Sequence, residues 1–285
     1  MTIRALKKGD ETKLEQFLKQ YAETSMFLRS NLRNSGLGYH ESPYHGEYIA
    51  SFDINKNING VIVHYWNCII MMQSDSHQVL EALLQSFKTA LYRPIAGILG
   101  PSDQARRVIE YLNIQEDKLA INRAEGLYRT KISELKPFSL PEKHKIEIVD
   151  AKMVNPTILF EWLKDYHIES LGGTDNDALR QQIKIEVSYM MEGMDRWVLL
   201  VNSKPSCLVG FNARLPDIVQ LGPVWTPVKY RNRGYAKMLI SLVLKKAQNT
   251  GVEKAFLFTD NPAAIKAYET IGFEKCGSIR LAITK

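Results

Sequence analysis

The hydrophobic and polar positions of residues 146–285 follow two periods, one typical of helices and one typical of strands. Apolar residues at helical spacing predict helices, and short apolar runs between turn residues predict strands. Helices are expected at 156–170, at 176–192, after the turn at 231–236 and after Asn261, and strands at 196–202, 206–214, 218–226, 253–259 and 276–284. This order predicts an α/β fold, a mixed sheet flanked by helices.

The first half of the chain predicts a similar order of elements. Strands are expected at 46–53, 60–73 and 95–99, and helices at 77–91 and from Ser102. A length of 285 residues suggests two domains of about 150 residues each. The segment KPFSLPEKHK at 136–145 has two prolines and no hydrophobic period, as a boundary does. The prediction is two tandem domains, 1–137 and 146–285, joined by a linker at 138–145.

A turn in the second half has the composition of a phosphate-binding site. An apolar strand with two prolines, expected to bend near its end, leads into the basic sequence RNRGYA at 231–236, and a helix follows. The first amides of a helix have no intrahelical acceptor, and the helix dipole adds positive charge there. Gly234 lets a ligand approach the backbone closely. The turn therefore predicts that main-chain amides bind a diphosphate.

This turn resembles the acetyl-CoA signature of the GNAT superfamily of N-acetyltransferases. That signature is Arg or Gln, two residues, Gly, one residue, and Gly or Ala, which Arg231 to Ala236 matches after a strand ending in Val-Trp-Thr-Pro. The dinucleotide fingerprint needs a third glycine, and the P-loop needs a Gly-Lys-Ser/Thr that is missing here. The resemblance implies that acetyl-CoA is the cosubstrate, bound by Val224, Trp225, Thr226, Arg231, Asn232, Arg233, Gly234, Tyr235 and Ala236.

A second segment of the chain extends the resemblance. The sequence NPAAIKAYETIGF at 261–273 is similar to the late strand-to-helix segment of the same superfamily. The resemblance implies that Asn261 helps to hold the pantetheine and that Tyr268 protonates the departing thiolate of coenzyme A. From the residues alone, Asn261 is equally a helix cap, and Tyr268 is a core tyrosine on a buried helical face.

The first half resembles a GNAT domain that has lost this chemistry. Its corresponding junction reads Gln73-Ser74-Asp75-Ser76-His77, which has no glycine and has an acid where the second half has arginines. A diphosphate would be repelled there. We expect a degenerate GNAT-like domain at 1–137 that does not bind coenzyme A. The alternative is an unrelated α/β domain.

Composition narrows the class of protein. The net charge of +6 includes no run of five Lys or Arg, so nucleic acid is not an expected partner. Three scattered cysteines argue against a disulfide framework and against a metal site, and they fit a reducing compartment. Neither a signal peptide nor a membrane-spanning segment is visible. We therefore expect a cytoplasmic enzyme that needs no metal.

The expected reaction is direct transfer of an acetyl group from acetyl-CoA to an amine. The amine must be neutral to attack, and main-chain donors at Val224 to Thr226 would polarise the thioester. His167, Glu169 and Asp217 are candidate bases, although a solvated surface role is open for each. Two other functions remain open: a sensor that binds acyl-CoA without turnover, and an interaction scaffold. The sequence predicts neither the acceptor nor the oligomeric state.

Overall fold

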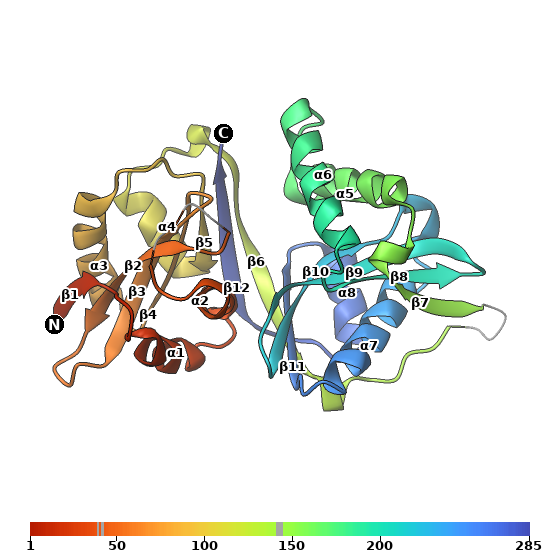
Figure 1. The fold of residues 1–285 in the computed structure, drawn as a ribbon, viewed down its shortest axis with the longest axis horizontal. Helices are drawn as coiled ribbons and strands as arrows, with labels where there is room; N and C mark the ends of the chain where they lie inside the picture. The colour runs from red at the N-terminus through yellow and green to blue at the C-terminus, as the bar shows by residue number, and fades with distance from the viewer. Residues whose placement is uncertain (39, 41–42, 141–144) are drawn as a thin grey trace. The chain divides into compact units, whose positions relative to one another are not determined.

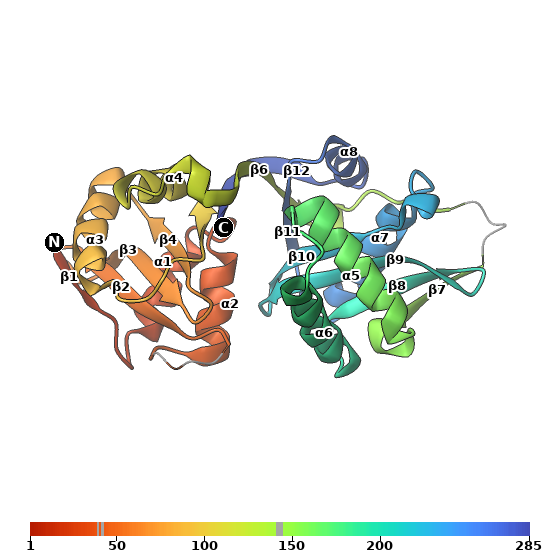
Figure 2. The same cartoon turned by 90° about the horizontal axis from the view of Figure 1, so that it is seen from above.

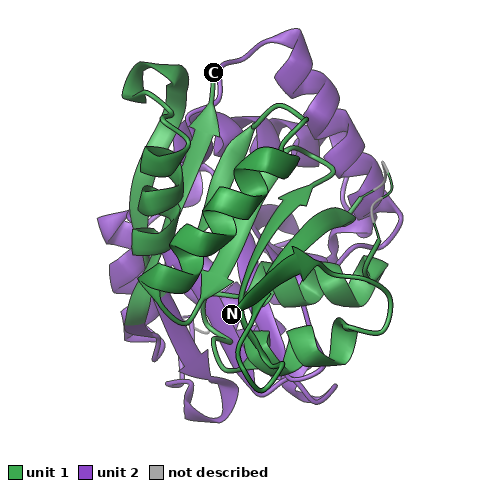
Figure 3. Cartoon of the chain, turned by 90° about the vertical axis from the view of Figure 1, so that its left-hand side faces the viewer, with its two compact units in different colours: residues 1–127, 276–285 green, residues 128–275 purple. Residues whose placement is uncertain are grey.

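The computed structural model describes residues 1–38, 40, 43–140 and 145–285, and it divides the chain into two compact units. One unit comprises residues 1–127 and 276–285, and the other comprises residues 128–275 (Figure 3). Both units are mixed sheets flanked by helices, so the predicted fold class is confirmed. The division differs from the expected linker at 138–145, of which residues 141–144 lie outside the described residues.

The first unit contains four helices of eight or more residues and seven strands among its described residues. Its elements are β1 (Thr2–Ala5), α1 (Glu11–Lys19), α2 (Met26–Ser35), β2 (Gly46–Phe52), β3 (Ile58–Tyr65), β4 (Ile69–Ser74), α3 (His77–Ala90), β5 (Gly97–Pro101), α4 (Ser102–Tyr111), β6 (Leu119–Lys131) and β12 (Glu274–Thr284). The strand order is β1-β2-β3-β4-β5-β12-β6. Helices α1 and α2 pack on one face of these strands, and α3 and α4 pack on the other.

The prediction of a single strand at 60–73 was wrong. Residues 58–74 form two antiparallel strands, β3 and β4, joined by a turn in which Cys68 has φ 60°. The turn residues Trp66 to Cys68 include neither glycine nor proline, and the apolar run continues on both sides. The one turn former here is Asn67, whose Oδ1 accepts from the Ile69 amide at 3.3 Å, and a single asparagine inside an apolar run is a weak signal.

The second unit repeats this order of elements (Figure 1). They are β7 (Ile146–Asp150), α5 (Pro156–Leu171), α6 (Asp177–Met191), β8 (Arg196–Val201), β9 (Lys204–Arg214), β10 (Ile218–Trp225), α7 (Tyr235–Gln248), β11 (Lys254–Thr259) and α8 (Pro262–Thr270). The strand order is β6-β11-β10-β9-β8-β7. Asparagine side chains cap three of the helices: Asn155 on α5, Asn176 on α6 and Asn261 on α8.

Alternating side chains of β8 and β9 build two cores in the second unit. Trp197, Leu199 and Cys207 pack against α7 and α8, whereas Val198 and Leu208 pack against α5 and α6. The period of two along a strand sends neighbouring residues to opposite faces. Helices α5 and α6 therefore cover one face of the sheet, and α7 and α8 cover the other (Figure 2).

The last strand of the chain completes the sheet of the first unit. Residues 279–283 of β12 pair antiparallel with residues 97–101 of β5. Ala282 is fully buried in the core formed with α3 and α4. Residues 276–285, which were expected in the second domain, therefore belong to the first unit.

Candidate active site

Two neighbouring strands of the second unit separate where the sequence predicted a bend. Strand β10 pairs in parallel with β11 only from Ile218 to Gln220. On its other edge β10 continues along β9 as far as Trp225, with register shifts on both sides of Leu221. Beyond Gln220, in the described residues, β10 has no strand partner on the β11 side. Backbone groups of the last part of β10 are therefore directed toward a gap in the ladder.

The turn after β10 leaves the N-terminus of α7 open. Gly234 is the N-cap residue, with φ 81° and ψ 5°, a left-handed conformation that favours glycine. No side chain caps the helix, and its first turn contains no acidic residue. Asn232 also has a positive φ, 61°. The first amides of α7 therefore meet neither a side-chain cap nor a carboxylate of the same turn, which is the arrangement that accepts an anion.

The basic side chains of the turn have aromatic and acidic neighbours. The Arg231 guanidinium lies over the Trp225 ring, 4.9 Å from its centroid, and Arg231 Nε donates to the Thr226 carbonyl at 3.0 Å. Arg231 Nη1 and Nη2 contact the two carboxylate oxygens of Glu169 at 2.7 and 2.8 Å. Arg233 is exposed, with its guanidinium 5.9 Å from the Tyr230 ring centroid. Arg231 is thus held at the end of β10, whereas Arg233 faces solvent.

The side chains of Val224, Trp225 and Thr226 turn into the protein. Val224 packs against the α7 core, and Trp225 is buried in the α5–α6 core. The Thr226 hydroxyl donates to Cys207 Sγ at 3.3 Å. Only the backbone of this segment is therefore placed to meet a ligand. Tyr235 is likewise buried, and Ala236 packs on the same core.

Tyr268 lies in the interior of the second unit. It projects from α8 and is 7% exposed. Burial, together with the Tyr166 hydroxyl on α5 and the Cys207 thiol on β9, raises the pKa of Tyr268. Tyr166 packs with the core on the α5–α6 face of the sheet, and Tyr268 lies in the core on the α7–α8 face. A phenol with a raised pKa keeps its proton at neutral pH and is able to donate it.

Asn261 acts as a helix cap. Its side-chain oxygen accepts hydrogen bonds from the amides of Ala263 at 2.9 Å and Ala264 at 3.2 Å. The residue is exposed at the end of β11. Capping occupies Oδ1, and the two donors of Nδ2 are directed elsewhere.

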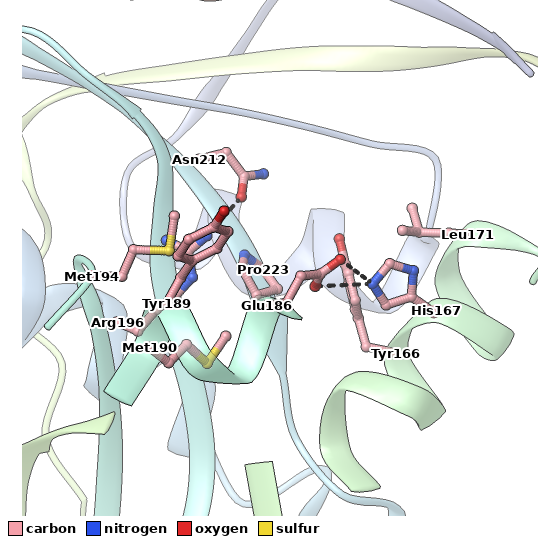
Figure 4. Close-up of a pocket in the computed structure, with 10 residues that line it drawn as sticks. All are labelled: Tyr166, His167, Leu171, Glu186, Tyr189, Met190, Met194, Arg196, Asn212 and Pro223. Carbon is pink, nitrogen blue, oxygen red and sulfur yellow. Dashed lines mark hydrogen bonds and ion pairs between the residues drawn. The ribbon is translucent and has the colours of Figure 1, made fainter. Parts of the chain in front are cut away.

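A cavity of about 230 Å³ lies between α5, α6 and the strands (Figure 4). Its lining residues are Tyr166, His167, Leu171, Glu186, Tyr189, Met190, Met194, Arg196, Asn212 and Pro223. Pro223 is the residue before Val224, and the ring centroid of Tyr166 lies 6.3 Å from that of Trp225. The cavity therefore reaches the stretch of β10 that has left β11.

The structure separates the three candidate bases. Glu169 is paired with Arg231 at 2.7 Å. Asp217 precedes β10, at the opposite end of that strand from Trp225. Seven residue steps of about 3.3 Å place these two ends about 23 Å apart. His167 alone of the three lines the cavity.

Sequence reasoning missed three residues of this site. Glu186 bonds His167 across the two helices, the Tyr166 ring packs near the Trp225 ring at the end of β10, and Cys207 accepts from Thr226. Each contact joins residues of different elements. No spacing along the chain indicates such pairs, because they depend on how α5 packs on α6 and on the strands.

The corresponding junction of the first unit is closed by its own side chains. Gln104 of α4 bonds the backbone of Ser74 at the end of β4, accepting from its amide at 2.9 Å and donating to its carbonyl at 3.0 Å. Ser76 is the N-cap of α3, and its hydroxyl accepts from the Val79 amide at 3.4 Å. The strand edge and the helix N-terminus that are open in the second unit are therefore satisfied internally here.

Known structures share this architecture along the whole chain. A GCN5-related N-acetyltransferase from Sphaerobacter thermophilus aligns with a TM-score of 0.59 at 13% identity, covering 99% of this chain and 94% of that one. A tandem GNAT protein from the clavulanic acid biosynthesis pathway, solved without AcCoA, aligns with a TM-score of 0.57 at 10% identity, covering 99% and 97%. These similarities establish the fold, two tandem GNAT-like domains, as predicted.

Sequence comparison matches part of the second unit to a known family. Residues 157–273 match the family model of the acetyltransferase (GNAT) family. An acetyltransferase of Agrobacterium fabrum is 37% identical over 78 residues, which are 27% of this chain and 56% of that relative. The match therefore spans little more than half of the relative's length. Residues 157–273 form a domain of the GNAT acetyltransferase family, whose general chemistry is acyl transfer from acetyl-CoA.

The described residues contain neither a candidate metal site nor a candidate membrane-spanning helix. No group of three or more His, Cys, Asp or Glu side chains in that part of the chain is arranged to hold a metal ion. None of the helices described has both the length and the apolar character that a membrane span requires.

Proposed function

We propose that the second unit is an N-acetyltransferase that moves an acetyl group from acetyl-CoA directly to an amine. One observation carries the proposal: α7 begins at a left-handed Gly234 with neither a side-chain cap nor an acid, whereas α3 of the first unit is capped by Ser76. The same fold thus leaves one helix N-terminus open and closes the other. An open N-terminus beside Arg231 and Arg233 suits a diphosphate.

The residues around this turn fit the parts of coenzyme A. The amides of Asn232 to Ala236 would hold the diphosphate, with Arg231 and Arg233 supplying charge. The backbone of Val224 to Thr226 would meet the pantetheine and the thioester carbonyl, because beyond Gln220 the described residues give β10 no strand partner on the β11 side. Asn261 lies at the end of β11 and would contact the pantetheine through its amide nitrogen. These assignments follow the family resemblance residue by residue.

The chemistry proposed is a single displacement. The amine attacks the thioester carbonyl, the C–S bond breaks, and the thiolate takes the proton of Tyr268. Cys207 is the nearest thiol, but burial raises its pKa to about 12 despite the hydrogen bond from Thr226. A thiol that stays protonated is a poor nucleophile, so an acetyl-cysteine intermediate is not favoured.

We further propose that the first unit does not bind coenzyme A. Ser76 accepts from an amide at the N-terminus of α3, where a diphosphate would bind, and Gln104 bonds the end of β4, where the pantetheine would bind. One acetyl-CoA per chain is therefore the stoichiometry expected by calorimetry. The three cysteines are free, and a reducing compartment, the cytoplasm, is the location we propose.

Replacing Tyr268 with Phe tests the acid role. Tyr268→Phe should bind acetyl-CoA with unchanged affinity and lose about 100-fold in kcat, because general acid catalysis contributes about 10²–10⁴-fold. Tyr48→Phe is the matched control: Tyr48 is also buried, its hydroxyl lies 3.1 Å from the Tyr65 hydroxyl, and it belongs to the first unit. Equal turnover of parent and Tyr268→Phe at every pH would remove the acid role.

Binding and turnover together separate the alternative functions. Acetyl-CoA binding without transfer to any amine would make the second unit an acyl-CoA sensor. Absence of binding would leave the interaction scaffold.

A further inference from the structure

The cavity between α5 and α6 contains a histidine paired with a carboxylate. His167 Nε2 lies 3.1 Å from both carboxylate oxygens of Glu186, and Gln182 Nε2 donates to Glu186 Oε1 at 3.0 Å (Figure 4). His167 is 9% exposed. The pair is therefore fixed by helix packing and is directed into the cavity rather than toward bulk solvent.

Glu186 remains a carboxylate at neutral pH. Burial works to raise its pKa, but hydrogen bonds from His167 and Gln182, with the charges of His167 and Arg196, lower it overall. A carboxylate that accepts from Nε2 keeps the proton on that nitrogen and leaves the lone pair of the neutral ring on Nδ1. Glu186 also stabilises the ring once it is protonated, as the carboxylate of a catalytic triad does.

The cavity that holds the pair borders the stretch of β10 that has left β11. Pro223 of β10 lines it, and so does Tyr166, whose ring centroid lies 6.3 Å from that of Trp225. Tyr268 belongs to the opposite face of the sheet. A reacting thioester at Val224 would thus have a proton donor on one side and a proton acceptor on the other.

The other residues that line the cavity indicate which kind of ligand it can hold. Leu171, Met190, Met194 and Pro223 are apolar, and methionine side chains adapt to irregular apolar groups. The volume of about 230 Å³ is below the roughly 300–1,000 Å³ of typical ligand sites. Other titratable or charged groups that face His167 in the cavity are Tyr166, Tyr189 and Arg196, besides Glu186. A small amine with an apolar substituent suits this space.

We propose that His167, oriented by Glu186, removes the proton from a small apolar ammonium that binds in this cavity. The proposal rests on the acetyltransferase function above. The ammonium gives one proton to His167, and the neutral amine attacks the thioester carbonyl. As the C–N bond forms and the C–S bond breaks, the nitrogen loses its second proton to solvent and the thiolate takes the proton of Tyr268. The Tyr268 phenolate then takes a proton back from solvent. His167 releases its proton to solvent, so the sum is one amide, one free coenzyme A and one proton.

The test measures pH profiles of kcat/KM with two probe amines, butylamine and 2-phenylethylamine. In the parent, kcat/KM should level off above an acidic limb. In His167→Gln it should fall at least 100-fold at pH 7 and rise about tenfold per pH unit, because only solution deprotonation then supplies the free amine. Glu186→Gln should lower kcat and leave the acetyl-CoA affinity unchanged. Asp217→Asn, at the far end of β10, should keep the parent profile.

Each outcome decides between the proposals. A parent-like profile in a folded His167→Gln that binds acetyl-CoA normally would overturn the assignment of the base. If His167→Gln does not fold, a parent-like profile in Glu186→Gln would overturn the pair. Acetyl-CoA binding by the parent without acetylation of either amine would refute the apolar acceptor while leaving the cofactor site intact. No acetyl-CoA binding at all would refute the acetyltransferase function itself.

Discussion

The same charge reversal can be made at either end of α7, once close to the proposed diphosphate site and once far from it. Lys237 is the third residue of the helix, and Lys245 is in its last turn. Lys237→Glu and Lys245→Glu change the net charge by the same two units. If the open N-terminus binds the diphosphate, only the first change should weaken acetyl-CoA binding.

The expected difference follows from distance. At about 6 Å in water, a charge change of two units acting on a diphosphate of about −2 costs about 2.8 kcal/mol, and physiological salt halves this to about 1.3 kcal/mol. That is about a tenfold loss of affinity. Lys245 lies eight residues further along, which at about 1.5 Å per residue is about 12 Å. At about 18 Å the screened cost is about 0.1 kcal/mol.

The effects on stability should be the reverse of the effects on binding: Lys245→Glu, and not Lys237→Glu, should destabilise the helix. An acid in the first turn interacts favourably with the helix dipole by about 0.3–1 kcal/mol. That gain offsets the lost contact of Lys237 with the Phe138 ring, whose centroid is 4.4 Å from Nζ. An acid in the last turn is unfavourable. Lys237→Glu should therefore unfold like the parent, whereas Lys245→Glu should lose about 0.5–1 kcal/mol.

Calorimetric titration with acetyl-CoA and chemical denaturation measure the two quantities separately. Weaker binding with unchanged stability at Lys237, and the reverse at Lys245, would support the site. Equal affinities of the two variants for acetyl-CoA would refute the reasoning, because the phosphates would then bind elsewhere.

Two further predictions concern packing. In Gly234→Ala the new Cβ would lie 2.6 Å from Cζ of Phe138, whereas in Gly251→Ala, also at positive φ, the nearest atom is the Pro216 carbonyl oxygen at 3.8 Å. Both should lose about 1–2 kcal/mol to left-handed strain, and Gly234→Ala about 1–3 kcal/mol more; equal losses by denaturation would show that Phe138 does not cover the turn. Ala282→Asp puts a charge into the core of the first unit, at a cost of several kcal/mol. Amide hydrogen exchange should therefore accelerate in α3 and α4. Unchanged exchange there would contradict the assignment of β12 to the core of the first unit.

The sequence predicted most elements of the second unit because each of these has a local signal, whereas the edge strand β7 was not predicted. Helix α5 begins at Asn155 and Pro156 and ends at Gly172, and the helical period between them is clear. Signals of that kind are local, and they cannot indicate which strands pair. The position of β12 beside β5 joins residues about 180 apart in sequence, so the expected domain 146–285 included a strand that belongs to the first unit.

In the candidate site, too, the parts with a local sequence signal were predicted and the parts that depend on long-range contacts were not. The backbone part, from Arg231 to Ala236, was visible because a glycine turn before a helix is a contiguous pattern. The side-chain part was not. Arg231 pairs with Glu169, and His167 pairs with Glu186, and both contacts require α5 to be placed against another element. The expected linker was misleading for a related reason: Phe138 and Leu140 lack periodicity, yet they pack beneath Gly234.

The two units show how one order of elements gives opposite chemistry. In both, a strand leads into a helix beside a second strand–helix pair. In the first unit a serine caps the helix and a glutamine side chain satisfies the strand edge. In the second, glycine occupies the cap position, and α8 presents a buried tyrosine instead. Backbone groups that are buried must be paired, so a unit that binds no ligand pairs them with its own side chains. The open junction of the second unit leaves those groups for a ligand, and this difference at the helix cap and at the strand edge separates a catalytic domain from a structural one in our proposal.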